Sequence, residues 1–266
     1  MKLTLVPYAG LCNRMNAIMS ALSYQKKTGI KPTIFWEKTS DCCAWFDELF
    51  EPIPSLEIGR LNDFYLKPSE KRNLYLPSLI RTFIFDKSFQ GEKISNENIL
   101  INGKNLGNVY VSSSNRFCPL CETECLGRHF VPLQHIQERI NAITSQYTTD
   151  TIGVHIRRTD NVAAISNSPI ELFFFKMNEA IRNNSNVNFF LATDDSQLKS
   201  EIKRKYKDRL ITFDSTLNRC SREGMEDAVV ELWALSLCAK ILGSSHSTYS
   251  SFASKLYGRP IETIAQ

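Results

Sequence analysis

Charged and polar residues follow a short β-branched run at 151–156, and they are the first residues in the chain that suggest chemistry. His155 lies near the end of this run, and Arg157, Arg158 and Asp160 follow it. An arginine side chain is planar and permanently charged, so it can bond two phosphate oxygens at once, and a neighbouring carboxylate can fix its orientation. Taken singly, such a cluster is usually a surface ion pair, and a strand histidine is as often a core residue.

Three further segments place polar or small residues directly after apolar runs. Hydroxyl groups and free backbone N–H groups at the start of a helix favour an anion, and glycine lets a ligand approach the backbone closely. Each segment also has a simpler interpretation, because Asp, Ser, Thr and Asn are common at helix caps and turns. The candidate ligand-binding residues are Gly10, Asn13 and Arg14; Thr193, Asp194 and Asp195; and Ser247, Thr248, Tyr249 and Ser250.

Two carboxylates, Asp227 and Glu231, lie on a helix predicted at 226–238. A carboxylate can accept hydrogen bonds from N1 and N2 of guanine, a pair of donors that adenine and uracil do not offer. The polar segments after the strands suit a nucleoside diphosphate as the ligand, and these carboxylates are compatible with guanine as its base.

The elements that must position these residues are strands that alternate with helices. The pattern predicts strands at 3–6, 33–36, 151–156, 187–192, 209–213 and 241–243, and helices at 14–28, 132–147, 196–206, 226–238 and 249–257. A further helix opens near 168–171, with Ser168 predicted as the cap of a capping box. Such alternation implies parallel sheets covered on both faces, with ligands bound beyond the carboxyl ends of the strands.

We therefore expect an α/β protein with two Rossmann-like, doubly wound parallel-sheet domains, at 1–148 and 149–266. Residues 40–130 are interrupted by five prolines and read as an irregular insertion in the first domain. A tight turn at 9–13 is expected to separate the first strand from its helix.

Composition excludes several classes of protein. The 266 residues are 42% hydrophobic and 23% charged, and 32 basic against 28 acidic side chains give a net charge of +4. This balance argues against disorder and against a duplex nucleic acid as the partner. The sequence contains no uninterrupted apolar run of the roughly 18–20 residues that span a bilayer, and the first eight residues read as a strand rather than a leader. We expect a cytoplasmic chain without a transmembrane segment and, despite eight cysteines, without structural disulfides.

A cysteine-rich segment offers a separate hypothesis. Cys118, Cys121, Cys125 and His129 supply four potential zinc ligands within 12 residues. Zinc sites usually combine two pairs of ligands that lie well apart in sequence. Ordinary thiols in an irregular insertion are therefore the simpler interpretation. We expect no metal site, and the zinc loop stays open as the alternative.

The motifs resemble the superfamily of α1,2-, α1,6- and protein O-fucosyltransferases. The segment Gly-Val-His-Ile-Arg-Arg-Thr-Asp at 153–160 is similar to its signature, and 10–14 resembles the N-terminal Gly-x-x-Asn-Arg loop. The segments 189–195 and 226–253 resemble its second and third motifs. The resemblance covers 1–30 and about 150–258, and 31–149 shows none.

This resemblance implies a GT-B-like fold, with two Rossmann-like domains facing across a cleft, and inverting transfer of L-fucose from GDP-β-L-fucose to a glycan hydroxyl without an obligatory metal. His155 would lie by the guanosine and Arg157 would hold the pyrophosphate, with Arg158 and Asp160 supporting that contact. Asn13 and Arg14 would reach the donor from the first domain. Ser247, Thr248 and Tyr249 would surround the phosphates, and Asp227 or Glu231 would read guanine.

Several features bear on the type of enzyme. In some relatives a carboxylate stands ten residues beyond the motif histidine, where this chain has Ile165, so the base is left open among Asp160, Glu37 and Asp41. A bacterial-type enzyme acting on a glycan or a lipid-linked oligosaccharide is expected, with peripheral contact to the inner membrane and the acceptor recognised within 31–149. The alternatives are a GT-B glycosyltransferase using another nucleotide-sugar, or a non-catalytic nucleotide- or carbohydrate-binding protein.

Overall fold

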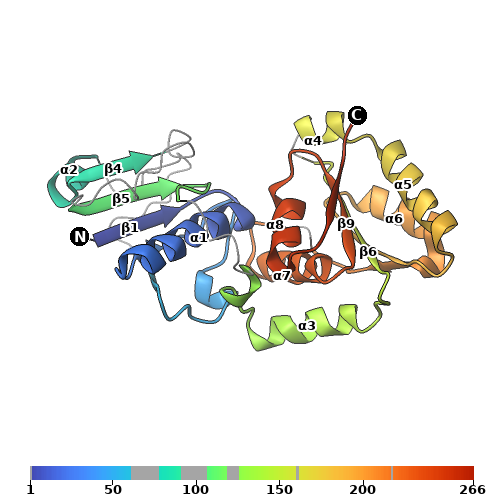
Figure 1. Cartoon of the computed structure of the whole chain (residues 1–266), viewed down its shortest axis with the longest axis horizontal. Helices are drawn as coiled ribbons and strands as arrows, with labels where there is room; N and C mark the ends of the chain where they lie inside the picture. Colours follow the sequence, from blue (N-terminus) through green and yellow to red (C-terminus); the bar gives the residue numbers. More distant parts are fainter. Residues whose placement is uncertain (1, 61–77, 91–106, 119–125, 160–161, 217) are drawn as a thin grey trace. The chain divides into compact units, whose positions relative to one another are not determined.

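The computed structural model describes residues 2–60, 78–90, 107–118, 126–159, 162–216 and 218–266, and its contacts divide the chain into two compact units (Figure 1). The first unit comprises Met1–Glu124, His129–Val131 and Asn218–Met225, and the second comprises Cys125–Arg128, Pro132–Leu217 and Glu226–Gln266. Helix α3 (Gln134–Thr144) groups with the second unit although it precedes residue 149. The long helix α7 (Arg222–Ser236) begins in the first unit and continues in the second.

The first unit contains a five-stranded parallel sheet in the order β3-β2-β1-β5-β4. Its strands are β1 (Lys2–Pro7), β2 (Thr33–Phe35), β3 (Glu57–Gly59), β4 (Lys87–Gln90) and β5 (Asn108–Ser113). Helix α1 (Leu11–Thr28) joins β1 to β2 and ends at Gly29, whose φ of 73° lies in the left-handed region that glycine tolerates. The short helices η1 (Phe46–Glu48) and α2 (Ser78–Ile84) also belong to this unit.

The second unit contains another five-stranded parallel sheet, in the order β10-β9-β6-β7-β8. Its strands are β6 (Ile152–Ile156), β7 (Phe189–Thr193), β8 (Leu210–Thr212), β9 (Lys240–Ser244) and β10 (Ile261–Ile264). The connecting helices are η4 (Leu126–Arg128), α4 (Val162–Asn167), α5 (Ile170–Asn183), α6 (Ser196–Tyr206), η5 (Lys207–Arg209) and α8 (Thr248–Tyr257). The central strand β6 pairs with β7 on one side and β9 on the other, so the carboxyl ends of all three meet at one edge.

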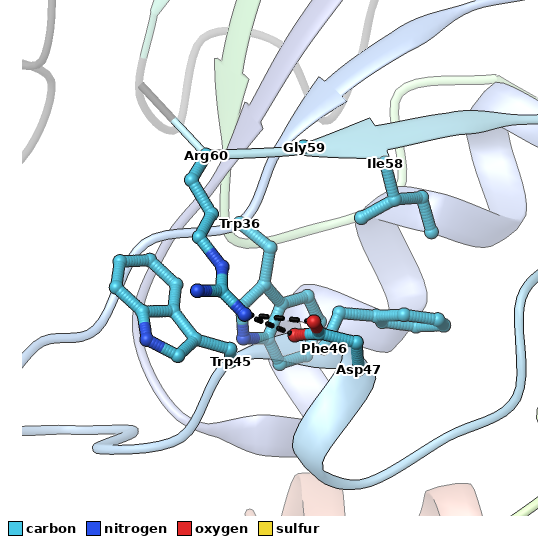
Figure 2. Close-up of a pocket in the computed structure, with 7 residues that line it drawn as sticks. All are labelled: Trp36, Trp45, Phe46, Asp47, Ile58, Gly59 and Arg60. Carbon is cyan, nitrogen blue, oxygen red and sulfur yellow. Dashed lines mark hydrogen bonds and ion pairs between the residues drawn. The ribbon is translucent and has the colours of Figure 1, made fainter. Parts of the chain in front are cut away.

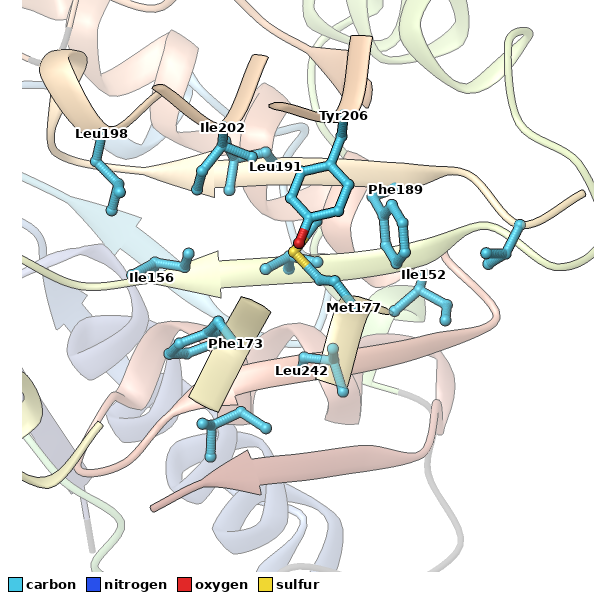
Figure 3. Packing of buried hydrophobic residues seen from close by; sticks show 13 residues of the cluster. Ile152, Ile156, Phe173, Met177, Phe189, Leu191, Leu198, Ile202, Tyr206 and Leu242 are labelled. Carbon is cyan, nitrogen blue, oxygen red and sulfur yellow. The ribbon is translucent and has the colours of Figure 1, made fainter. Parts of the chain in front are cut away.

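The core of the second unit follows from the alternation of side chains along β6. Ile152 and Ile156 are buried in a cluster with Phe173 and Met177 of α5 and with residues of α6 (Figure 3). Gly153 faces the opposite side, where an added Cβ would lie 2.6 Å from Leu235 Cδ1 and 3.2 Å from Cys238 Sγ. Glycine at this position lets α7 and the turn after it pack closely against β6.

The expected α/β class is confirmed, with two parallel sheets, and α6 begins and ends where the sequence predicted. The segment expected to be irregular contains β5, which pairs with β1 at the centre of the first sheet. Helix α1 begins at Leu11, so the predicted turn is shorter than expected and Asn13 lies in the first helical turn. None of the helices in the described ranges combines the length and apolarity needed to cross a membrane.

The capping box predicted at Ser168 is wrong. The Ser168 hydroxyl donates to the carbonyl oxygen of Ile264 at 2.6 Å and accepts from the N–H of Ser245 at 2.8 Å, and Pro169 occupies the cap position of α5. Ser168 is fully buried. Its hydroxyl group makes these two hydrogen bonds at the sheet edge instead of the expected capping bond to a backbone N–H of α5.

Candidate functional site

Arg157 and Asp194 form the centre of the polar edge of the second sheet. They follow the paired strands β6 and β7, whose last residues Ile156 and Thr193 are in register. The Arg157 Nε lies 3.1 Å from Asp194 Oδ2, and less than a fifth of either side chain is exposed. The Arg157 backbone N–H also donates to the Ser244 hydroxyl of β9 at 3.0 Å. The end of β6 is therefore held from both neighbouring strands.

The same carboxylate organises the loop after β6. Asp194 Oδ1 accepts from the N–H of Arg158 at 2.7 Å, and Oδ2 accepts from the Thr159 hydroxyl at 2.6 Å and from the Thr159 N–H at 3.3 Å. These bonds fix the backbone on which Arg157 stands. The next residue, Asp195, caps α6 by accepting from the N–H groups of Gln197 and Leu198.

The Arg158 guanidinium points to the carbonyl groups of the α4–α5 connection. It donates to the carbonyl oxygen of Ser168 at 2.7 Å and to that of Ile165 at 3.3 Å. In this arrangement Arg158 joins the β6 loop to the α4–α5 connection. Ile165 contributes only its backbone carbonyl group to this contact.

His155 and Tyr249 form a stacked pair on the face of β6 that carries Gly153. Their ring centroids are 5.0 Å apart with an interplanar angle of 30°, and the Tyr249 hydroxyl donates to the carbonyl oxygen of Ala228. Burial lowers the pKa of His155 to about 4, the charge of Arg157 adds to this effect, and Asp194 opposes it. His155 is therefore neutral near pH 7, and its buried Nδ1 has no hydrogen-bond partner among the residues that the structure describes.

The N-terminus of α8 lies at the same sheet edge, directly after β9. Ser247 is its cap residue, and Thr248 and Tyr249 begin the helix. Ser250 packs on Gly243, where an added Cβ would lie 2.6 Å from its hydroxyl oxygen. The Ser250 hydroxyl is buried and, within the described chain, lacks a hydrogen-bond partner. The segment thus has the helix N-terminus and hydroxyl groups that favour an anion.

The two candidate guanine-reading carboxylates have different surroundings. Asp227 is bonded on both oxygens, to the Arg139 guanidinium of α3 and to the N–H of Thr216 at 2.7 Å. Glu231 is 8% exposed, and its Oε1 is buried without a hydrogen-bond partner in the described part of the chain. Burial raises the pKa of Glu231 to about 8; Lys199 opposes the increase, and Asp227 and Asp194 add to it. An unsatisfied buried carboxyl group of this kind is typical of a functional site.

In the first unit, Arg14 holds two loops together. Its guanidinium is fully buried and donates to the carbonyl oxygens of Ala9 (2.7 Å from Nε) and Glu37, and to the hydroxyl of Thr39 at 2.6 Å. It also lies over the Trp36 ring, 5.1 Å from the centroid. The structure therefore places Arg14 inside the unit as a clamp on the segments after β1 and β2.

The other predicted residues of the first unit lie near this clamp. Asn13 donates to the carbonyl oxygen of Ser114 at 3.1 Å, and Gly10 is the cap residue of α1. Of the candidate bases, Glu37 is buried and Asp41 is exposed, and Asp160 lies outside the described residues. Cys121 and Cys125 are also outside them, so the zinc alternative remains a prediction.

The residues that sequence reasoning missed are connected by contacts between distant positions. Ser244 and Arg139 each bond a predicted site residue, Arg157 and Asp227 respectively, across more than 80 positions of sequence. No local spacing signals such pairs, because only the sheet order and the helix packing bring them together.

No family model matches the sequence, and no curated protein matches it. Solved structures match over nearly the whole chain. NodZ α-1,6-fucosyltransferase co-crystallised with GDP matches with a TM-score of 0.66 at 20% identity, over 96% of this chain and 92% of that chain. Fucosyltransferase NodZ from Bradyrhizobium matches with a TM-score of 0.66 at 21% identity, over 96% and 93%. POFUT1 in complex with GDP-fucose matches with a TM-score of 0.60 at 11% identity, over 99% and 98%. The structural neighbours are thus fucosyltransferases, in agreement with the resemblance of the sequence motifs, and the chain has their fold.

Proposed function

We propose that this protein is a fucosyltransferase that moves L-fucose from GDP-β-L-fucose to a hydroxyl group of a glycan, with inversion and without an obligatory metal. The observation that carries the proposal is the Arg157 side chain, held by Asp194 at the sheet edge where β9 ends and the chain leads into α8. It is supported by the fold, which is similar to that of proteins crystallised with GDP and GDP-fucose.

Arg157 would act on the leaving group. When the bond between the sugar carbon and the β-phosphate oxygen breaks, negative charge accumulates on the diphosphate. A guanidinium already oriented by a carboxylate stabilises that charge without further reorganisation, so it lowers the barrier more than it strengthens donor binding. The N-terminus of α8, with Ser247 and Thr248, would bind the same phosphates.

Glu231 would read the base, and His155 with Tyr249 would lie by the nucleoside. We favour Glu231 over Asp227 because both oxygens of Asp227 are engaged, whereas one oxygen of Glu231 is unsatisfied. Bound guanine would supply two N–H donors and a reason for the carboxyl group to ionise. The GT-B arrangement expected from the sequence, with the donor on the second unit and the acceptor on the first, is part of this proposal.

The nucleophile is the acceptor hydroxyl, which gives up its proton as its oxygen bonds the sugar carbon. Asp160, Glu37 and Asp41 are the candidate bases by chemistry. Of the two within the described residues, the exposed Asp41 fits an incoming acceptor better than the buried Glu37.

Isothermal titration calorimetry with GDP, UDP and ADP tests the ligand class, and hydrolysis or transfer of GDP-fucose tests the activity. Arg157→Ala is expected to reduce turnover by about 100-fold or more, the loss typical of one preorganised charge-stabilising group. Arg182→Ala is the matched control, because it removes the same charge from an exposed position on α5.

Different outcomes separate the alternatives. Binding of UDP or ADP in preference to GDP would indicate a glycosyltransferase with another donor. Binding of GDP without any turnover of GDP-fucose, in the wild type as in Arg157→Ala, would indicate a non-catalytic binding protein.

A further inference from the structure

A small pocket in the first unit lies at the carboxyl ends of β2 and β3, outside the residues discussed above for the donor (Figure 2). It is lined by Trp36, Trp45, Phe46, Asp47, Ile58, Gly59 and Arg60 and has a volume of about 90 Å³. Trp36 directly follows β2 and Arg60 directly follows β3, and the preceding residues Phe35 and Gly59 are in register. The pocket therefore occupies the edge of a parallel sheet at which ligands are usually bound.

The floor of the pocket is aromatic and fixed. Trp36 is 1% exposed, and its Nε1 donates to the carbonyl oxygen of Ala44 at 2.9 Å. Phe46 packs edge-on against it, with ring centroids 5.6 Å apart and an interplanar angle of 72°. Arg14 lies over the Trp36 ring, so the clamp described above also supports this floor.

The rim of the pocket is polar and exposed. Arg60 donates to both carboxylate oxygens of Asp47 at 2.7 Å, and its guanidinium lies 4.5 Å from the ring centroid of the half-buried Trp45 (Figure 2). About half of the Arg60 side chain and two thirds of the Asp47 side chain remain accessible to solvent. Both groups can therefore bond a ligand that enters the pocket.

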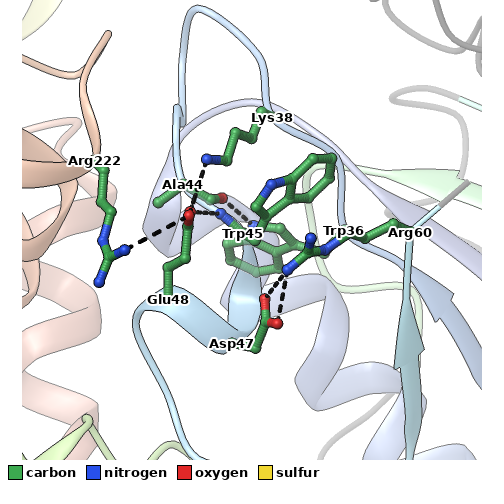
Figure 4. Close-up of polar contacts among 8 residues, drawn as sticks. All are labelled: Trp36, Lys38, Ala44, Trp45, Asp47, Glu48, Arg60 and Arg222. Atoms are coloured by element: carbon green, nitrogen blue, oxygen red, sulfur yellow. Dashed lines mark hydrogen bonds and ion pairs between the residues drawn. The ribbon is translucent and has the colours of Figure 1, made fainter. Parts of the chain in front are cut away.

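A second polar cluster holds the loop that carries Trp45 (Figure 4). Glu48 accepts from the Trp45 N–H at 2.8 Å and pairs with Lys38 at 2.8 Å, and Arg222 lies 3.9 Å from it. Burial would raise the pKa of Glu48, but the bonds from Lys38 and Trp45 and the charges of Lys38 and Arg222 outweigh it and lower the pKa. The loop is thus stabilised before any ligand arrives.

The charges of the pocket indicate the class of ligand. Arg60 and Asp47, the charged residues that line the pocket, are paired with each other, so neither a phosphate nor a cation would find an uncompensated opposite charge in its lining. What the pocket offers a ligand is the half-buried indole ring of Trp45, supported by buried aromatic side chains, together with one strong donor group and one strong acceptor group. A neutral sugar fits this set, because a pyranose ring has an apolar C–H face for the Trp45 ring and hydroxyl groups for Asp47 and Arg60.

We propose that this pocket is a saccharide-binding subsite, with the half-buried Trp45 ring as the stacking surface, the buried Trp36 and Phe46 rings as its support, and Asp47 and Arg60 as the hydroxyl-binding pair. With a volume of about 90 Å³ the pocket is small, so it takes the edge of one sugar unit. Resting on the proposed function, this inference assigns the sugar unit to the glycan acceptor.

The test uses the full-length protein and three neutral disaccharides, namely lactose, cellobiose and N,N′-diacetylchitobiose. Dissociation constants are measured by ligand-observed saturation-transfer NMR, and GDP affinity is measured by calorimetry on the same samples. We expect at least one disaccharide to bind, and Trp45→Ala and Arg60→Ala to weaken that binding by about ten-fold each. Both variants should keep the wild-type affinity for GDP.

Phe83→Ala is the control, since Phe83 is an 87% exposed aromatic residue on α2 of the same unit, and it should bind the disaccharide as the wild type does. Melting temperatures confirm that each variant is folded, and Arg60→Gln, which keeps a donor, should lose less affinity than Arg60→Ala. No binding of any disaccharide, or equal binding by Trp45→Ala, would overturn the inference while leaving the donor proposal intact. Binding that depends on Trp45 in a protein without affinity for GDP would support the subsite and remove its role as an acceptor site.

Discussion

Asp194 holds Arg157 in two ways: its Oδ2 lies 3.1 Å from the Arg157 Nε, and its Oδ1 accepts the backbone N–H of the following residue at 2.7 Å. The side chain of the proposed phosphate-binding arginine and the N–H of the next residue are thus held by a single carboxylate that directly follows the neighbouring strand. On the proposed function, Asp194 acts through Arg157 and does not itself need to contact the ligand.

Replacing Asp194 by Asn should therefore reduce catalysis more than donor binding. The variant keeps the size of the side chain but loses the ion pair with Arg157. Part of the interaction energy between Arg157 and the diphosphate must then be spent on orienting the Arg157 side chain. We expect kcat with GDP-fucose to fall about 10- to 100-fold with a smaller change in KM, and the free energy of unfolding to fall by about 1–3 kcal/mol. Steady-state kinetics and urea denaturation measure the two effects. Asp208→Asn, at an exposed position in η5, should change neither quantity.

Replacing Glu231 by Gln should stabilise the protein and weaken GDP binding. Because the folded-state pKa is raised to about 8 from an ordinary 4.5, ionisation of Glu231 favours the unfolded state. The cost is absent below pH 4.5, grows as the pH rises and is complete above about pH 8. The melting temperature of Glu231→Gln should therefore exceed that of the wild type at pH 8 and equal it near pH 4.

The same variant offers guanine one acceptor and an unwanted donor, so its affinity for GDP should fall about ten-fold. Calorimetry at pH 7 measures this loss. A variant with unchanged GDP affinity would show that Glu231 does not read the base, even if the stability result is as expected.

Replacing Gly153 by Ala should destabilise the second unit by overpacking. The new methyl group would lie 2.6 Å from Leu235 Cδ1 and 3.2 Å from Cys238 Sγ, and we expect a loss of about 1–3 kcal/mol in the free energy of unfolding. The double variant Gly153→Ala, Leu235→Ala should be less destabilised than the sum of the two single changes, because the second removes the nearest clash. Strict additivity in urea denaturation would contradict the proposed contact.

Replacing Arg14 by Lys should affect stability rather than the donor. Lysine cannot reproduce the fork that bonds Ala9, Glu37 and Thr39, and a buried charge without partners is costly, so we expect a loss of about 3 kcal/mol. Thermal unfolding measures it. GDP affinity at a temperature where the variant is folded should equal that of the wild type, whereas a marked loss would mean that Arg14 contacts the donor, as the sequence motif alone suggests.

The sequence by itself determined the class of fold and the sheet edge at which we propose that the chemistry occurs. Strands and helices of the second half could be predicted because their periodicity and caps are local, and α6 begins and ends as expected. In a parallel sheet, the carboxyl ends of the strands lie at one edge, and this can be inferred from the order of strands and helices alone. That property was enough to predict that Arg157, His155 and the serines near 247 lie at the same edge. Strand β5 was missed because its pairing with β1 joins positions more than 100 residues apart.

Only the tertiary structure decided what each polar side chain does. Asp194 and Asp195 are adjacent and identical in type, yet one holds Arg157 and the other caps α6. Asp227 and Glu231 lie one turn apart on α7, yet Arg139 engages the first, and burial leaves the second with an unsatisfied oxygen. The pocket at Trp36 depends on two strand ends that meet through register. Hydrogen-bond partners and burial depend on residues far away in the chain, and for this reason the local sequence does not specify them.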